Sequence, residues 1–158
     1  MQKITPCLWF DSQAEEAARF YTSVFENSSI GGISQYGEGM PMPAGTVMTV
    51  AFTLNGQDFT ALNGGPEFAF TEAISFQVDC ADQDEVDEYW EALTADGGRE
   101  SQCGWLQDKF GLSWQIVPSV LPEIFGGPDP AGAQRAVAAM MQMRKLDIGA
   151  LRKAYAGE

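Results

Sequence analysis

An internal repeat constrains this chain more than any other feature of its sequence. The strand-like segments Trp9–Asp11 and Gln77–Asp79 each lead into a polar helix start. An aromatic pair then follows in each copy, Phe20-Tyr21 in the first and Tyr89-Trp90 in the second. The offset is about 70 residues, longer than the roughly 20–50 residues of solenoid repeats. We therefore predict two supersecondary units of one kind within a single domain, residues 1–158.

Each copy is predicted to be a βαβββ unit. In the first copy, residues 1–66, a capping box at Ser12–Glu15 starts the helix, and Asn55-Gly56 joins two strands in a hairpin. In the second copy, residues 73–118, Asp82 caps the helix. The expected strands are 4–10, 30–36, 46–54, 57–62, 73–80, 104–110 and 112–117, and the Gly- and Pro-rich segment 37–45 is expected to be an exposed loop.

The remaining residues, 119–158, are predicted to form a helical extension. Asp129-Pro130 places a cap residue before a proline at the first helical position. An apolar face that includes Val137 and Met141 follows, and it is suited either to fold back on the sheet or to contact a partner subunit.

Composition excludes several classes of function. The chain has 9 basic and 22 acidic residues, a net charge of −13, which disfavours binding to nucleic acid. It contains no histidine, which removes Ser-His-Asp triads and the common zinc and iron sites. Its three cysteines form no CxxC pair. Because it lacks a signal peptide pattern and a long apolar run, we expect a cytoplasmic protein with no membrane partner.

The sequence resembles the glyoxalase/bleomycin-resistance (vicinal oxygen chelate) superfamily, and within it the PhnB-like branch that often carries a demethylubiquinone methyltransferase name. The matching segments are Ile4–Asp11, Ala14–Ala17 with Phe20-Tyr21, Ala61–Pro66 and Cys103–Pro118. The resemblance implies an α+β fold in which two tandem βαβββ units form cupped mixed sheets, followed here by the C-terminal helices. It also implies a small ligand inside the cups and a homodimer.

The metal-binding members of that superfamily hold a divalent ion with His, Glu or Gln on the first and last strands of each unit. Here Ala73 stands at the expected histidine, Gln115 at the expected glutamate, and Asn63 near the other expected carboxylate. Each exchange of carboxylate for amide removes attraction on the order of 4 kcal/mol at ~4 Å. We therefore expect no tightly bound metal or other cofactor. If a weak divalent ion binds at all, Gln115 and Asn63 are its expected ligands.

The predicted function is the binding of a small neutral or aromatic molecule in a strand-lined cup. Strand alternation puts Ser75 with Gln77, and Ser113 with Gln115, on shared faces. The predicted pocket residues are Trp9, Phe52, Asn63, Ser75, Gln77, Trp105 and Gln115.

Two alternatives stay open at this point. One is a lyase- or dioxygenase-like enzyme that uses a weakly held metal, or Asp108, Cys103 or Cys7 without metal; its catalytic residues are otherwise unknown. The other is a dimeric structural module whose cup is filled by its own side chains. Methyl transfer is not expected, because no glycine-rich loop leads from a strand into a capped helix.

Overall fold

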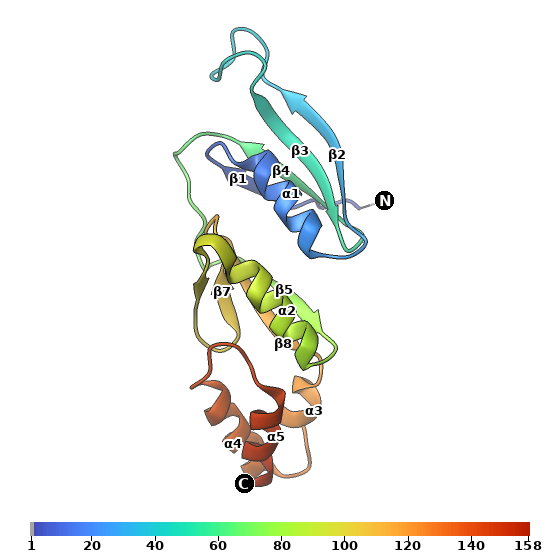
Figure 1. Ribbon diagram of the computed structural model, residues 1–158, viewed down its shortest axis with the longest axis vertical. Helices are drawn as coiled ribbons and strands as arrows, with labels where there is room; N and C mark the ends of the chain where they lie inside the picture. Colours follow the sequence, from blue (N-terminus) through green and yellow to red (C-terminus); the bar gives the residue numbers. More distant parts are fainter. Residues whose placement is uncertain (1) are drawn as a thin grey trace. The chain divides into compact units, whose positions relative to one another are not determined.

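The computed structural model describes residues 2–158 and divides them into a unit that ends at Phe70 and a second unit, Thr71–Glu158. Each unit runs strand, helix and three strands in chain order (Figure 1). The first holds β1 (Cys7–Phe10), α1 (Ala14–Val24), β2 (Ser29–Gln35), β3 (Val47–Leu54) and β4 (Gln57–Asn63). The second holds β5 (Ser75–Cys80), α2 (Gln83–Thr94), the 3₁₀ turn η1 (Ala95–Gly97), β6 (Arg99–Glu100), β7 (Trp105–Gln107) and β8 (Ser113–Pro118). The predicted fold of two tandem βαβββ units is confirmed.

The two sheets have equivalent strand orders, β1-β4-β3-β2 and β5-β8-β7-β6. In each, the first strand pairs in parallel with the last, and the other neighbours pair in antiparallel fashion. The predicted hairpin at Asn55-Gly56 is present, and both residues adopt positive φ, 48° and 82°, as a type I′ turn requires.

One helix covers one face of the first sheet. Ala14, Ala17, Ala18 and Tyr21 of α1 are fully buried, because this spacing puts them on a single stripe of the helix. The ring of Phe52 stacks with two others: its centroid is 6.3 Å from that of Tyr21 and 5.3 Å from that of Phe59. Alternation along β3 and β4 leaves Thr49, Ala51, Thr60 and Leu62 on the opposite face.

The start of α1 differs from the prediction. Gln13 is the N-cap residue and makes no capping bond, so the expected capping box at Ser12 is wrong. Instead, the side chain of Asn63 at the end of β4 accepts a hydrogen bond from the backbone N–H of Ala14 at 2.8 Å. Such a long-range cap is invisible to a rule that compares residues three apart.

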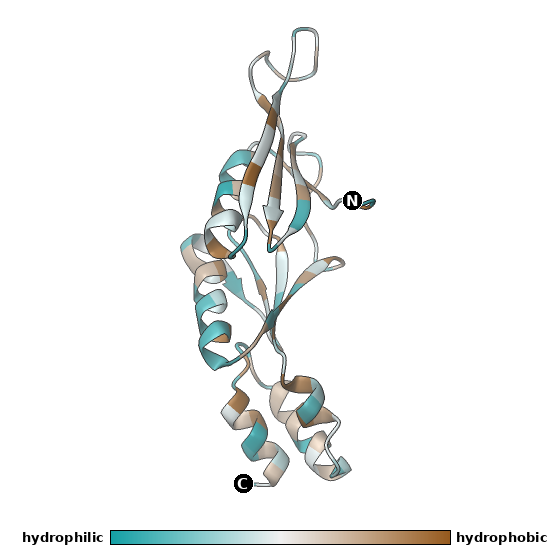
Figure 2. Cartoon of the chain, turned by 90° about the vertical axis from the view of Figure 1, so that its right-hand side faces the viewer, coloured by the Kyte–Doolittle hydropathy of each residue, from teal (hydrophilic) through white to brown (hydrophobic). Residues whose placement is uncertain are grey.

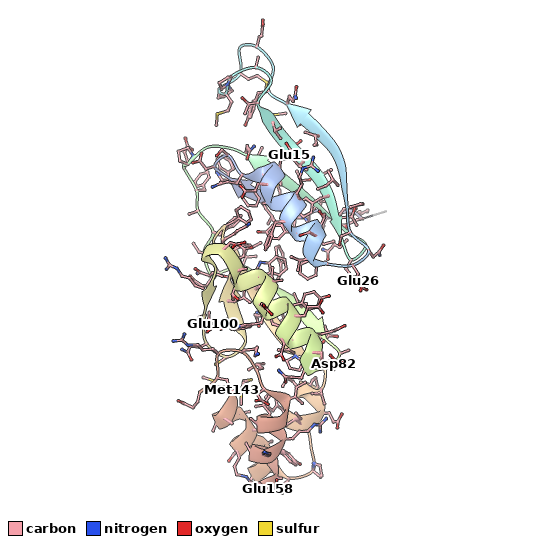
Figure 3. The ribbon with its side chains drawn as sticks, in the orientation of Figure 1. Glu15, Glu26, Asp82, Glu100, Met143 and Glu158 are labelled. Atoms are coloured by element: carbon pink, nitrogen blue, oxygen red, sulfur yellow. The ribbon has the colours of Figure 1, made fainter. Side chains whose placement is uncertain are left out.

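In the second unit, α2 buries Val86, Trp90 and Leu93. Asp82 lies at the start of this helix (Figure 3). It caps the helix as predicted, since its side chain accepts from the backbone N–H of Glu85 at 2.9 Å. In Figure 2 most of α2 carries hydrophilic colours, as expected for a helix with one buried stripe. The predicted strand 104–110 ends early, at Gln107, because Asp108 begins a tight turn.

The C-terminal extension consists of α3 (Leu121–Phe125), α4 (Pro130–Met140) and α5 (Ile148–Ala156). It has a hydrophobic cluster of its own, made of Leu121, Ile124, Ala136, Leu146 and Leu151. Asp129 caps α4 through the backbone N–H of Ala131, as Asp129-Pro130 predicted.

The extension is tied to the second βαβββ unit by the segment between α4 and α5, on which Met143 lies (Figure 3). The backbone N–H groups of Cys103 and Gly104 donate to the carbonyls of Met143 and Arg144, both at 2.8 Å. Gln83 of α2 accepts from the N–H of Ile148 and donates to the carbonyl of Leu146.

A surface ion pair adds to this junction. Lys145 lies 2.8 Å from the carboxylate of Asp87 on α2, and this bond, together with one from Gln83, lowers the pKa of Asp87. Both side chains are well exposed, so the pair adds little stability.

None of the helices within residues 2–158 has the length and apolar character that crossing a membrane requires.

Candidate functional site

The face of the second sheet turned away from α2 carries polar side chains in two rows. Leu106, Trp114 and Ile116 point toward the helix and are buried, so the alternate residues of each strand point the other way. The strand register sets these residues opposite one another. The first row is Ser75, Ser113 and Gln107, and the second row is Gln77, Gln115 and Trp105.

One hydrogen bond joins the two rows, and another joins two members of the second row. The Nε2 of Gln115 donates to the Oγ of Ser75 at 2.8 Å, and the Oε1 of Gln115 accepts from the Nε2 of Gln77 at 3.3 Å. Both ends of the Gln115 amide are therefore engaged. Trp105 stands directly across from Gln115 on β7 and is half-buried. Four of the predicted pocket residues thus lie together on one face.

Ser113, in the first row, differs from its neighbours. It is fully buried, and its Oγ has no hydrogen-bond partner anywhere in the described part of the chain. Beside it, Gln107 donates from Nε2 to the carboxylate of Glu72, just before β5. Neither Gln107 nor Glu72 was predicted as a site residue, although alternation along β7 places Gln107 on this face.

The three predicted pocket residues of the first unit do not form an equivalent group. Phe52 and Asn63 point toward α1, on the face opposite the predicted pocket. Phe52 is a core residue, and Asn63 is occupied by backbone groups, since its Nδ2 donates to the carbonyl of Val47 at 3.0 Å while its Oδ1 caps α1. Only Trp9 lies on the face away from the helix.

The segment Ala61–Pro66 serves to hold Trp9. The indole Nε1 donates to the carbonyl of Gly65 at 2.9 Å, and Phe68 packs edge-on against the ring, with centroids 4.9 Å apart. A Cβ on Gly64 would lie 2.4 Å from the indole, so only glycine fits there. Each residue of the Asn-Gly-Gly part of this motif therefore has a structural role: Asn63 caps α1, Gly64 allows the close approach of the indole, and Gly65 adopts a positive φ of 97°.

The acid and thiols considered for metal-free catalysis are placed as follows. Asp108 is buried in the β7–β8 turn, where its carboxylate accepts from the N–H groups of Phe110 and Leu112 and from the indole of Trp114. Cys103 lies beside Met141, with 3.6 Å between the sulfur atoms.

The other two thiols are poor nucleophiles at neutral pH. Desolvation raises the pKa of Cys7, which lies at the start of β1. Desolvation by burial, followed by nearby carboxylates, raises the pKa of Cys80 to about 12. A thiol needs its thiolate form to attack, so neither group is activated.

The side chains at the expected metal positions do not fit a divalent ion. Gln115 offers a neutral amide already bonded at both ends, Ala73 offers no donor, and Asn63 faces the other side of its sheet. Over residues 2–158, no three His, Cys, Asp or Glu side chains are grouped to hold a metal. The donor set of the face thus disagrees with the metal chemistry that the superfamily implies.

Comparison with known proteins identifies the family. A family model described as 3-demethylubiquinone-9 3-methyltransferase matches residues 2–117. The chain belongs to this family. The predicted resemblance to the PhnB-like branch of the glyoxalase/bleomycin-resistance superfamily is therefore confirmed. No curated protein matches the chain.

Solved structures agree with this assignment. The PhnB protein from Bacillus cereus is 40% identical, covers 74% of this chain and 99% of its own length, and has a TM-score of 0.67. Protein PA1353 from Pseudomonas aeruginosa is 19% identical, covers 75% and 98%, and has a TM-score of 0.61. The fosfomycin resistance protein FosX from Listeria monocytogenes, solved with Mn(II) and sulfate, is 16% identical, covers 78% and 95%, and has a TM-score of 0.54. The last two share the fold alone. The PhnB-like family model ends at residue 117, so α3, α4 and α5 lie outside it.

Proposed function

We propose that this PhnB-like protein binds a small, neutral, aromatic molecule on the face of the second sheet turned away from α2, without a tightly bound divalent metal. The observation that carries the proposal is the row Gln77, Gln115 and Trp105. It sets two amides beside a half-buried tryptophan.

The chemistry of this row favours a neutral ligand. A side-chain amide both donates and accepts hydrogen bonds, and it can rotate to present either its oxygen or its nitrogen. Because it is uncharged, it cannot neutralise a charge on the ligand. An aromatic ring stacks on an indole with a preference for offset or edge-on geometry. The net charge of −13 disfavours anions in addition. A flat molecule with one polar edge meets all three conditions.

The family name suggests methyl transfer, but the residues described on this face offer no group suited to catalysing that reaction. Binding, sequestration or sensing of an aromatic compound needs only the groups described. The alternative of an enzyme with a weakly held divalent metal is disfavoured, because Gln115 offers the metal a neutral amide where the superfamily implies a carboxylate. We further propose a homodimer in the cytoplasm; sedimentation velocity tests the first part and cell fractionation the second.

Two measurements test the main proposal. The first is elemental analysis of protein purified without chelators and re-equilibrated with Zn²⁺, Ni²⁺, Mn²⁺ and Fe²⁺. We expect no ion to remain at near-stoichiometric level after desalting. A retained ion would overturn the metal-free proposal.

The second measurement is a thermal-shift screen of aromatic and quinone-like compounds. We expect Gln115→Ala to abolish a shift that the wild type shows. Gln102→Ala, which alters an exposed loop, is the matched control and should keep it. The absence of any shift across the whole set in the wild type would refute ligand binding of this class.

A further inference from the structure

The unpartnered hydroxyl of Ser113 is the polar atom that the fold leaves unexplained. Ser113 opens β8 and stands opposite Ser75 on one side and Gln107 on the other. It is 0% exposed, and within residues 2–158 nothing accepts from or donates to its Oγ. Buried polar groups nearly always have a partner, and an exception calls for a specific reason. A hydroxyl that can both donate and accept suits a ligand group that does the same.

The bond between Gln107 and Glu72 lies across the same end of β8. Gln107 is on β7, Glu72 leads into β5, and β8 runs between those two strands. Neighbouring strands in a sheet are ~4.8 Å apart, so β5 and β7 lie about 10 Å apart on either side of β8. We name this pair of side chains the Glu72–Gln107 strap. Glu72 is exposed and Gln107 half-buried, and one hydrogen bond joins them.

We propose that the strap opens on binding and that Ser113 then hydrogen-bonds a hydroxyl or carboxamide at the edge of a flat, two-ring ligand. This inference rests on the proposed function and deepens it by naming the ligand class. The two rows are two residues apart along the strands, or roughly 6.7 Å. A fused two-ring molecule beside Trp105 therefore carries a substituent as far as Ser113.

The probes that test this are 2-naphthol and 2-methoxynaphthalene, measured by isothermal titration calorimetry. The two have the same rings, but only the naphthol both donates and accepts. We expect the wild type to bind the naphthol about tenfold more tightly, the ratio that one hydrogen bond supplies. Ser113→Ala should bring the two affinities together, and Ser101→Ala, in an exposed loop, should keep the tenfold ratio.

A second variant tests the strap separately and does not depend on the folding of Ser113→Ala. Glu72→Ala removes the carboxylate end, so both probes should bind several-fold more tightly because no bond has to open. Glu88→Ala, an exposed carboxylate on α2, is the matched control and should change neither affinity.

The outcomes separate the two proposals. If both probes bind with equal affinity, or if the tenfold ratio survives Ser113→Ala, the role of Ser113 is refuted while aromatic binding stands. If Glu72→Ala weakens both probes, the strap holds the site in shape, and the opening mechanism is refuted. If neither probe binds and the thermal-shift screen is also empty, the proposed function itself fails.

Discussion

Replacing Ser113 by alanine should make the free protein more stable. A buried hydroxyl without a partner costs about 1–3 kcal/mol in lost hydration. Removing the oxygen leaves a gap on the order of 10–15 Å³, which at ~24 cal/mol per Å³ costs roughly 0.3 kcal/mol. Since Ser113 is 0% exposed and its Oγ lacks a partner among residues 2–158, the full penalty applies. The net expectation is a gain of about 0.7–2.7 kcal/mol in the free energy of unfolding.

Urea unfolding, followed by circular dichroism, measures this change as a shift of the midpoint. Ser119→Ala is the matched control in the same unit, because the Oγ of Ser119 donates to the carbonyl of Cys80 at 3.0 Å. That variant should lose roughly 0.5–1 kcal/mol. The same chemical change is thus expected to have opposite signs at the two serines. If Ser113→Ala is destabilising as well, the hydroxyl has a partner, and the reasoning from an unsatisfied group is refuted.

Three further predictions concern stability. Gly64→Ala should destabilise the first unit by about 1–3 kcal/mol, because the added Cβ displaces the indole of Trp9. Gly32→Ala is the control and should lose far less, because no atom lies within 4 Å of the added Cβ. Urea unfolding compares the two variants, and equal losses would contradict the close approach at Gly64. Asp108→Asn should lose about 2–3 kcal/mol of unfolding free energy, because an amide has one acceptor oxygen for the three N–H groups that now donate to the carboxylate. An unchanged melting temperature would show that the turn forms without these three hydrogen bonds. The last prediction concerns pH, because burial raises the pKa of Cys80 from 9.0 to about 12 in the folded chain. The stabilisation from its neutral thiol is fully present below pH 9 and is lost as the pH rises from 9 toward 12. Cys80→Ala should therefore flatten the alkaline fall of the melting temperature in that window, and an unchanged fall would refute the raised pKa.

The confirmed predictions are those that rest on local chemistry. Asn55-Gly56 makes a type I′ hairpin because its two residues accept positive φ at little cost, whatever the sheet around them. Asp82 caps α2 because its partner N–H is three residues away. The repeat itself follows from periodicity, since each helix must bury one stripe against its sheet.

The mispredicted features depend on residues far apart in the chain. The capping box at Ser12 is wrong because Asn63, which comes 49 residues after Ala14, supplies the bond. Strand alternation predicted that Ser75 and Gln77 share a face and that Ser113 and Gln115 do, but the strand register puts these residues and Trp105 on one common face. Phe52 and Asn63 lie on the face that α1 covers, which alternation alone does not specify. No local pattern distinguishes an amide that caps a helix from one that lines a pocket.

The architecture of this protein could be predicted from its sequence, because hydrophobic periodicity and turn residues act over a few neighbours and the same order of elements occurs twice. The sequence also determined that the metal positions of the superfamily hold amides and alanine here. Three features follow from the tertiary structure: which amides share a face, the engagement of Asp108 in a turn and of Asn63 in a helix cap, and the burial of Ser113 with an unpartnered hydroxyl among residues 2–158. Those facts depend on which strands become neighbours, and hydrogen bonds between neighbouring strands join residues that the sequence keeps far apart.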